Sequence, residues 1–152
     1  MTAKETNPKD RIGSTKLPYH LVPSTATALA AMVHLSGAMK YGAFNWRAAG
    51  VRSTIYYDAM QRHLASWLNG ETNDPESGLS HLGHVIACAN ILVDAEACGM
   101  LTDDRPPPAP VAELQSKLNC IVKEWKQAND DTEIIDDDDL IIRAGEAVCE
   151  GT

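Results

Sequence analysis

The chain has 152 residues, of which 44% are hydrophobic, 5% aromatic and 22% charged, and its formal net charge is −8. This length suits one compact domain with an appendage, and the scarcity of aromatic residues predicts an aliphatic, helix-forming core. No apolar run is long enough to span a bilayer, and the N-terminal segment lacks the apolar core of a secretion signal. We therefore expect a cytoplasmic protein that does not enter a membrane.

Charge is distributed unevenly along the chain. Residues 1–105 hold nine Lys or Arg and ten Asp or Glu, whereas residues 106–152 hold four and eleven. The boundary is a proline-rich run, Pro106 to Pro110, which cannot continue a helix. We expect a core domain over 1–105, followed over 106–152 by a proline-rich linker and an acidic helical appendage. The acidic balance argues against a nucleic-acid partner.

Apolar residues at helical spacing predict three helices in the core, over residues 24–41, 53–68 and 75–98. Ser24 is a suitable N-cap for the first helix, and Gly42 is a suitable C-cap. The third helix has the clearest start signal, with Asp74 as N-cap and Pro75 at the first helical position.

The appendage predicts a fourth, amphipathic helix from Val111 to Ala128 and a short last helix near residues 140–148. Between them lies an acidic run, Asp136 to Asp139, which we interpret as a solvated stretch or an acidic helix start. Strand signals are scarce, so the chain predicts an all-α fold. Because three helices make a thin core for a monomer, we expect a helical bundle completed by oligomerisation, as a dimer or tetramer.

The strongest candidate site follows the second helix. His81 and His84 are three residues apart on one helix face, and Glu71 and Asp74 precede them across a turn. Histidine and carboxylate ligands together suit Mn, Co, Zn or Fe better than a Mg site made only of oxygen ligands. In the alternative interpretation, Asp74 is only a helix cap and the histidines are hydrogen-bonded residues of a helix.

A second candidate pair, Arg62 and His63, lies on the second helix, one turn after Asp58. The planar donor fork of Arg62 suits a phosphate, and His63 could join the pocket of the other histidines. Alternatively, Asp58 and Arg62 form an exposed ion pair at i,i+4 spacing.

Aromatic and cationic residues gather in a loop of sequence KYGAFNWR, residues 40–47. Tyr41 or Trp46 could stack on a base, Asn45 could recognise a purine edge, and Lys40 could bind phosphate. The loop could equally fill the core with its aromatic residues. Lys9 and Lys16 belong to an N-terminal segment that could close over phosphates or remain a frayed end.

Several catalytic motifs are absent from the sequence. It has no P-loop, no G-x-G-x-x-G, no His-Asp dipeptide and no G-x-S-x-G. Its four cysteines show no C-x-x-C spacing, and we expect reduced thiols rather than a disulfide framework. These cysteines are Cys88, Cys98, Cys120 and Cys149.

Four segments, NPKDRIGSTK, KYGAFNWR, RHLASWLNGETNDPESG and HLGH, occur in this order within residues 7–106. Their combination resembles the phage dATP/dGTP diphosphohydrolases, the MazZ-type relatives of the MazG nucleotide pyrophosphatases. The resemblance implies a MazG-like all-α core with sites built by two protomers. It also implies hydrolysis of dATP and dGTP to monophosphates and pyrophosphate with Mg, Mn or Co. In phages whose DNA contains 2-aminoadenine, such an enzyme removes dATP and supplies dGMP inside the host cytoplasm.

The sequence departs from the MazG pattern of E-x-x-E on one helix and E-x-x-D on the next. The metal could be held by a mixed histidine and carboxylate set, by carboxylates from Asp58, Glu71, Asp74 or Glu76, or the protein could bind nucleotides without cleaving them. A helical host-interaction module and a pyrimidine-specific enzyme therefore stay open as alternatives.

The resulting hypothesis assigns three groups of residues. Catalysis is assigned to His63, His81 and His84. The metal ligands are assigned to Asp58, Glu71, Asp74, His81 and His84. Substrate binding is assigned to Lys9, Lys16, Lys40, Tyr41, Asn45, Trp46 and Arg62.

Overall fold

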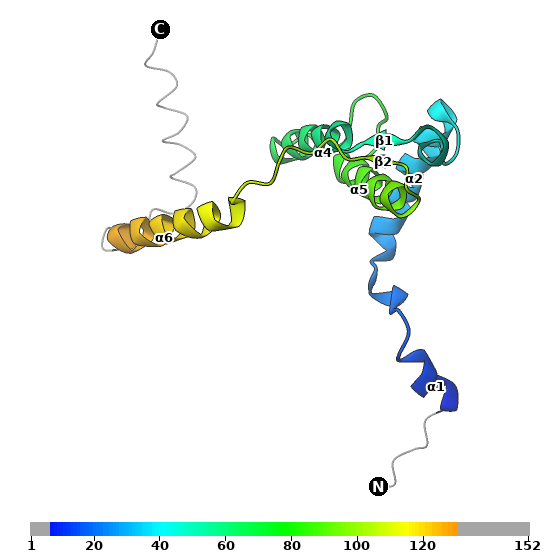
Figure 1. The fold of residues 1–152 in the computed structure, drawn as a ribbon, viewed down its shortest axis with the longest axis horizontal. Coiled ribbons are helices and arrows are strands. Elements are labelled where there is room, and N and C mark those ends of the chain that lie inside the picture. Colours follow the sequence, from blue (N-terminus) through cyan, green and yellow to red (C-terminus); the bar gives the residue numbers. More distant parts are fainter. Residues whose placement is uncertain (1–6, 131–152) are drawn as a thin grey trace. The chain divides into compact units, whose positions relative to one another are not determined.

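The computed structural model describes residues 7–130 and divides the chain into two units, residues 1–106 and 107–152. The described part is mostly α-helical, which confirms the predicted fold class (Figure 1). The first unit contains α1 (Pro8–Gly13), a 3-10 turn (Tyr19–Leu21), α2 (Ser24–Tyr41), α3 (Trp46–Ala49), β1 (Val51–Arg52), α4 (Ser53–Leu68), α5 (His81–Ala97) and β2 (Leu101–Thr102). The second unit contains α6 (Val111–Asp130).

Helix α5 packs against both α4 and α2 and is the central element of the first unit. Gly83 allows the close approach to α2, because a Cβ atom there would lie 3.3 Å from Cγ2 of Val33. The two short strands pair in parallel, with Val51 opposite Leu101. This pairing ties the start of α4 to the segment after α5.

Helices α2 and α4, the first two helices predicted from the sequence, follow their local signals closely. α4 spans the predicted residues, and α2 ends at Tyr41 with Gly42 as its C-cap, as predicted, where the φ of 90° is accessible to glycine. The prediction of Ser24 as N-cap is wrong. Pro23 is the cap residue, Ser24 is the first helical residue, and the hydroxyl of Thr27 donates to the Pro23 carbonyl at 3.2 Å.

The predicted start of the third helix at Asp74 and Pro75 is also wrong, because α5 begins at His81. Asp74 does cap a turn, since its carboxylate accepts the Ser77 backbone N–H at 2.9 Å. The turn ends at Gly78, which has a φ of 70°. The backbone N–H of Asp74 then donates to the Leu79 carbonyl at 2.8 Å, which closes a loop before the helix.

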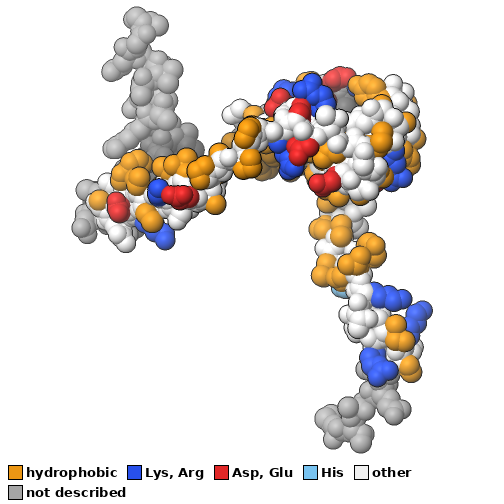
Figure 2. Space-filling model, in the orientation of Figure 1, with side chains coloured by type: hydrophobic (Ala, Val, Ile, Leu, Met, Phe, Trp, Pro, Cys, Tyr) orange, Lys and Arg blue, Asp and Glu red, His pale blue; other side chains and the backbone are white. Residues whose placement is uncertain are grey.

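Large side chains are poorly buried in this unit. The buried hydrophobic residues among those described are Ala30, Ala87 and Ala95. Four large apolar residues at helical spacing on α2 are between 40% and 81% exposed, namely Leu29, Met32, Leu35 and Met39. Figure 2 shows hydrophobic side chains on the visible surface of the molecule. Within residues 7–130, no helix is both long and apolar enough to cross a membrane.

The fourth predicted helix is confirmed as α6, which extends to Asp130. The predicted helix near 140–148 and the run Asp136 to Asp139 lie outside the described residues. Cys88, Cys98 and Cys120 are free thiols, as expected, whereas Cys149 lies outside the described residues.

Candidate functional site

Two histidines from different helices meet at the centre of the candidate site. The Nδ1 atoms of His63 on α4 and His81 at the start of α5 lie 2.8 Å apart. His81 is only 3% exposed. Its backbone N–H donates to the Thr72 carbonyl at 3.1 Å, which fixes the first turn of α5 against the preceding loop. Because two nitrogen lone pairs repel each other, this contact requires an N–H or a cation between the rings.

The loop between α4 and α5 brings polar groups to the same place. The hydroxyl of Ser77 lies 2.7 Å from Nε2 of His84, and Oδ2 of Asp74 lies 3.7 Å from the same nitrogen. The ring of His84 stacks on His63 with a centroid distance of 4.5 Å. The loop and two helices therefore build one cluster of three imidazoles and a carboxylate.

One buried nitrogen in this cluster lacks a hydrogen bond. Nε2 of His81 lies 3.2 Å from Oε2 of Glu71, but the geometry is not that of a hydrogen bond, and no other partner exists among the described residues. An unsatisfied buried imidazole nitrogen is costly. This atom is therefore available to a ligand.

The cluster has the donors of a transition-metal site. Ligand atoms of His63, Asp74 and His81 all lie within 4.8 Å of one another. Two imidazole nitrogens bound to one ion at about 2.0–2.1 Å are separated by about 2.9 Å at a right angle and by about 3.3 Å at the tetrahedral angle, so the 2.8 Å between the His63 and His81 nitrogens is nearer to the right-angled arrangement. Imidazole and carboxylate donors together suit Mn, Co, Zn or Fe. These residues therefore fit a divalent ion.

The environment favours the unprotonated, metal-binding form of the histidines. Partial burial lowers the pKa of His63, and the neighbouring His84 and His81 lower it further. Partial burial also lowers the pKa of His84, although Asp74 opposes that shift. Burial would raise the pKa of Asp74, but hydrogen bonding by Ser77 and the nearby histidines brings it below its usual value. A neutral imidazole beside an ionised carboxylate is the state that binds a cation.

A cavity of about 280 Å³ opens beside the cluster. His63, Asp74 and His84 line it, together with part of the 40–47 loop. The lining residues of this segment are Lys40 and Tyr41 at the end of α2, and Asn45 and Trp46 at the start of α3, so helices occupy both ends of the predicted loop and only residues 42–45 lie between them. The ammonium group of Lys40 forms an exposed ion pair with Glu76. The cavity therefore combines possible metal ligands, a cation and aromatic groups.

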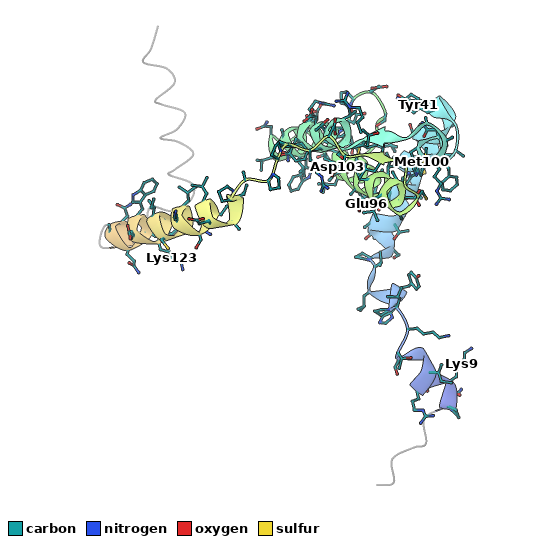
Figure 3. The ribbon with its side chains drawn as sticks, viewed as in Figure 1. Lys9, Tyr41, Glu96, Met100, Asp103 and Lys123 are labelled. Carbon is teal, nitrogen blue, oxygen red and sulfur yellow. The ribbon has the colours of Figure 1, made fainter. Side chains whose placement is uncertain are left out.

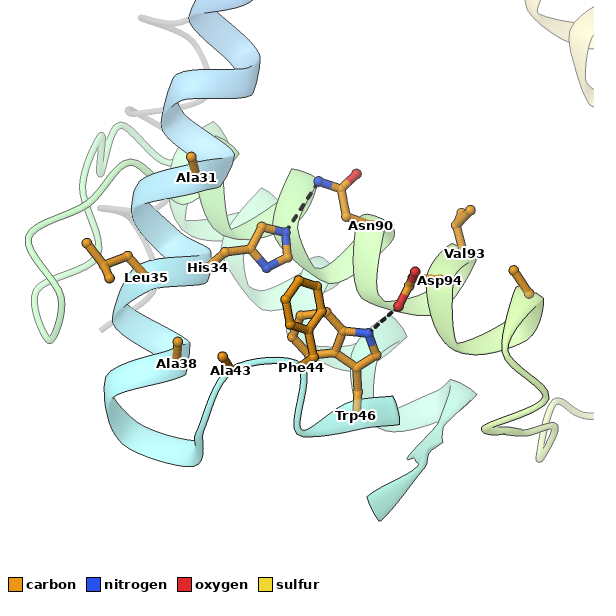
Figure 4. Close-up of a pocket in the computed structure, with 11 residues that line it drawn as sticks. Ala31, His34, Leu35, Ala38, Ala43, Phe44, Trp46, Asn90, Val93 and Asp94 are labelled. Atoms are coloured by element: carbon orange, nitrogen blue, oxygen red, sulfur yellow. Dashed lines mark hydrogen bonds between the residues drawn. The ribbon is translucent and has the colours of Figure 1, made fainter. Parts of the chain in front are cut away.

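A second, larger cavity of about 760 Å³ lies between α2 and α5 (Figure 4). Trp46 and His34 line both cavities. The indole N–H of Trp46 donates to Asp94 at 2.6 Å, and Arg47 forms two hydrogen bonds with the same carboxylate at 2.8 and 2.7 Å. The Arg47 guanidinium lies 4.8 Å from the Phe44 ring centroid. These contacts fix the aromatic wall, in which Phe44 has a φ of 54°.

Four of the predicted site residues lie elsewhere. Asp58 and Arg62 are exposed on α4, belong neither to the candidate metal group nor to the cavity lining, and form no ion pair with each other among the described residues. Lys9 lies on α1 (Figure 3), and Lys16 lies in the segment after it. Both lysines are exposed and neither contributes to the cluster in this structure.

Sequence reasoning missed Asp94, His34 and Asn90, and it placed Ser77 in the loop before His81 without giving it a role. Ser77 carried a local signal, since it stands in the Asp74 turn that precedes His81. Asp94 carried none, because its bond to Trp46 joins residues that are 48 positions apart. His34 and Asn90 come together across α2 and α5, with 3.4 Å between side-chain nitrogens.

A family model described as dATP/dGTP diphosphohydrolase, N-terminal, matches residues 6–105. No curated protein matches the chain. No solved structure matches it.

Proposed function

Since this chain belongs to the dATP/dGTP diphosphohydrolase family, we propose that its N-terminal domain hydrolyses dATP and dGTP to dAMP or dGMP and pyrophosphate. Water adds to the α-phosphorus, and the bond from that phosphorus to the oxygen bridging it to the β-phosphorus breaks. We place the reaction in residues 1–105 and regard residues 106–152 as an appendage.

The observation that carries the proposal is the cluster of His63, Asp74 and His81 beside a cavity that also contains Lys40. The three would hold a divalent ion, with His84 and Glu71 adjacent. Such an ion supplies charge neutralisation on the triphosphate and activation of water. A triphosphate requires this neutralisation, and the same cavity offers the ammonium group of Lys40.

The chain's own residues divide the remaining work. His84 has a lowered pKa, so it is neutral near pH 7 and able to accept a proton from water. The hydrogen bond between the Ser77 hydroxyl and Nε2 of His84 orients this ring. Lys40 exchanges its exposed bond with Glu76 for a phosphate oxygen, since exposed ion pairs are weak.

We place the base against the 40–47 loop. Trp46 is held by Asp94 and lines the cavity together with Asn45 and Tyr41. An indole ring stacks on any base, so Asn45 is our candidate for purine selection. The role of Lys9, Lys16 and Arg62 in phosphate binding requires the N-terminal segment or a second protomer to approach the cavity.

We also propose that the active form is a homo-oligomer. The exposed apolar residues of α2 would be covered by a second copy, and the first unit buries only alanines as apolar core among its described residues. Sedimentation equilibrium at micromolar concentration should give a dimer or tetramer. A monomer under these conditions would contradict the proposal.

A turnover panel tests the reaction directly. The full chain is incubated with each dNTP and NTP, with Mg, Mn or Co, and with EDTA, and the products are separated. We expect metal-dependent formation of dAMP and dGMP with pyrophosphate. Formation of a diphosphate and phosphate would contradict the bond assignment.

The same panel separates the alternatives. Turnover of pyrimidine triphosphates in preference to purines would identify a different specificity. Thermal stabilisation by nucleotides without product under any metal would favour a binding module, which the lack of E-x-x-E and E-x-x-D already suggests.

A further inference from the structure

Helix α6 presents a row of apolar side chains without a partner. Figure 2 shows hydrophobic side chains along this helix. Each member of the row is 39% or more exposed. The row consists of Val111, Leu114, Leu118, Ile121 and Trp125.

The spacing of this row is that of a coiled coil. Steps of three and four residues alternate from Val111 to Trp125, and Ala128 continues the pattern. The mean period is 3.5 residues. In a heptad labelled a to g, Val111, Leu118 and Trp125 then occupy the positions labelled a. Leu114, Ile121 and Ala128 then occupy the d positions. Val122, which is 43% exposed, adds one e position beside this stripe, and the other large exposed apolar residues of α6 keep to the a and d positions of a seam for one partner helix.

We propose that α6 pairs with α6 of a second copy of this chain in an antiparallel coiled coil. In an antiparallel pair, the positions labelled a on one helix face the positions labelled d on the other. Leu118 then faces the partner subunit's Ile121, Trp125 faces the partner subunit's Leu114, and Val111 faces the partner subunit's Ala128. Every a and d position of the helix is matched in this register.

Charge selects the antiparallel arrangement over the parallel one. Lys117 and Glu124 occupy the g positions, which face each other across an antiparallel pair, so Lys117 meets the partner subunit's Glu124 twice by symmetry. In a parallel pair a g position faces the e position five residues further on, and Lys117 would meet Val122. Opposite charges therefore pair in one arrangement only.

Both charged groups are available for this contact. Glu124 has no ion-pair partner among the described residues. Lys117 bonds Glu113 one turn earlier at 2.7 Å, but their side chains are 69% and 66% exposed. Such a pair contributes little and is readily exchanged. Residues 111–130 hold three lysines and three acidic residues, so net charge does not oppose self-association.

Zero-length carbodiimide coupling of the full chain tests the pairing. Isotope-labelled and unlabelled chains are unfolded together, refolded, coupled and digested. We expect an amide between Lys117 and Glu124 that joins one labelled and one unlabelled peptide. This product reports the α6 contact itself, whatever the core domain does, and it does not depend on the proposed reaction.

Two variants sharpen the test. Leu118→Asp keeps both coupling groups but places a carboxylate in the apolar seam, and should lower the yield by about tenfold or more. Lys123→Glu changes an outward-facing f position and should leave the yield unchanged.

The coupling has outcomes that overturn the proposal. One is a Lys117–Glu113 product without a mixed-isotope Lys117–Glu124 product, because the reagent then reached Lys117 and found no partner. Another is coupling of Lys117 to acidic residues of 131–152 within one chain, which would make α6 half of an intramolecular hairpin. Coupling to the core domain would assign the apolar face to that domain.

Discussion

The Nδ1 atoms of His63 and His81 lie 2.8 Å apart although 18 residues separate them in the chain. The contact exists because α5 packs against α4 and begins at His81, after a loop that Asp74 and Gly78 shape. Two ring nitrogens held this close beside the carboxylate of Asp74 form a group that could hold a divalent ion.

Replacing His81 with alanine should lower turnover of dATP and dGTP by about 100-fold or more, because the proposed site loses a central ligand. Circular dichroism should show that the helices remain. The exposed histidine of the 3-10 turn gives a matched control, and His20→Ala should keep normal turnover. Normal turnover in a folded His81→Ala variant would remove His81 from the site.

Metal binding should be visible without any substrate. Mn or Co should raise the melting temperature of the full chain, because an ion present at 100 times its dissociation constant adds about 2.7 kcal/mol to the free energy of unfolding. The effect should disappear in Asp74→Asn, since the carboxylate supplies the only acidic ligand of the described group. An equal shift in Asp74→Asn and in the unaltered chain would place the ion elsewhere.

Gly83 should tolerate no branched side chain. A Cβ atom added there would lie 3.3 Å from Cγ2 of Val33. Gly83→Val should therefore separate α5 from α2 and lower the free energy of unfolding by about 1–3 kcal/mol, as measured with denaturant.

The matched control for Gly83 is a helical glycine in open space. A Cβ atom at Gly37 would meet nothing within 4 Å, so Gly37→Ala should stabilise α2 by up to about 1 kcal/mol. Destabilisation by both variants to the same extent would mean that packing at Gly83 is not the cause.

The sequence predicted elements whose ends carry local signals, and it failed where tertiary contacts overrode them. α4 was placed correctly because Asn69 and Gly70 end it. The Asp74 and Pro75 signal was real but produced only one turn, since Gly78 reverses the chain. That His63 would touch His81 depends on the packing of two helices, which residue spacing within one helix does not contain.

Asp104 should stabilise the start of α4 only while it is ionised. Its carboxylate accepts the Thr54 hydroxyl at 2.6 Å and the Thr54 backbone N–H at 2.9 Å. These bonds, aided by Arg52, hold the pKa of Asp104 at about 2, below its ordinary value of 3.8. A depressed carboxyl pKa stabilises the fold above the unfolded-state pKa, and the effect is lost as the pH falls through the folded-state pKa.

The melting temperature of Asp104→Asn should therefore be below that of the unaltered chain at neutral pH, and the two should converge as the pH falls from 3.8 to about 2. Asp103→Asn is the matched control: Arg105 also holds the pKa of Asp103 at about 2, but this contact joins residues two apart and does not need the fold, so we expect a smaller difference. A constant difference across this pH range would show that the charge of Asp104 is not what stabilises the helix.

Asp94 should act on substrate binding through the 40–47 loop. Its carboxylate accepts one hydrogen bond from the Trp46 indole and two from the Arg47 guanidinium, and these bonds keep the pKa of Asp94 at about 2. An amide of the same size cannot accept from all three donors, and its own N–H groups oppose the guanidinium. Asp94→Asn should therefore loosen Trp46 at the wall of the histidine cavity.

We expect the KM of Asp94→Asn for dATP and dGTP to rise several-fold while kcat changes less, because the histidine cluster is untouched. Glu96→Gln, an exposed change two residues further along α5, should leave both constants unchanged. Steady-state kinetics together with melting temperatures separate the two possible roles. A lowered melting temperature with an unchanged KM would make Asp94 a purely structural anchor, and the base would then have to bind away from Trp46.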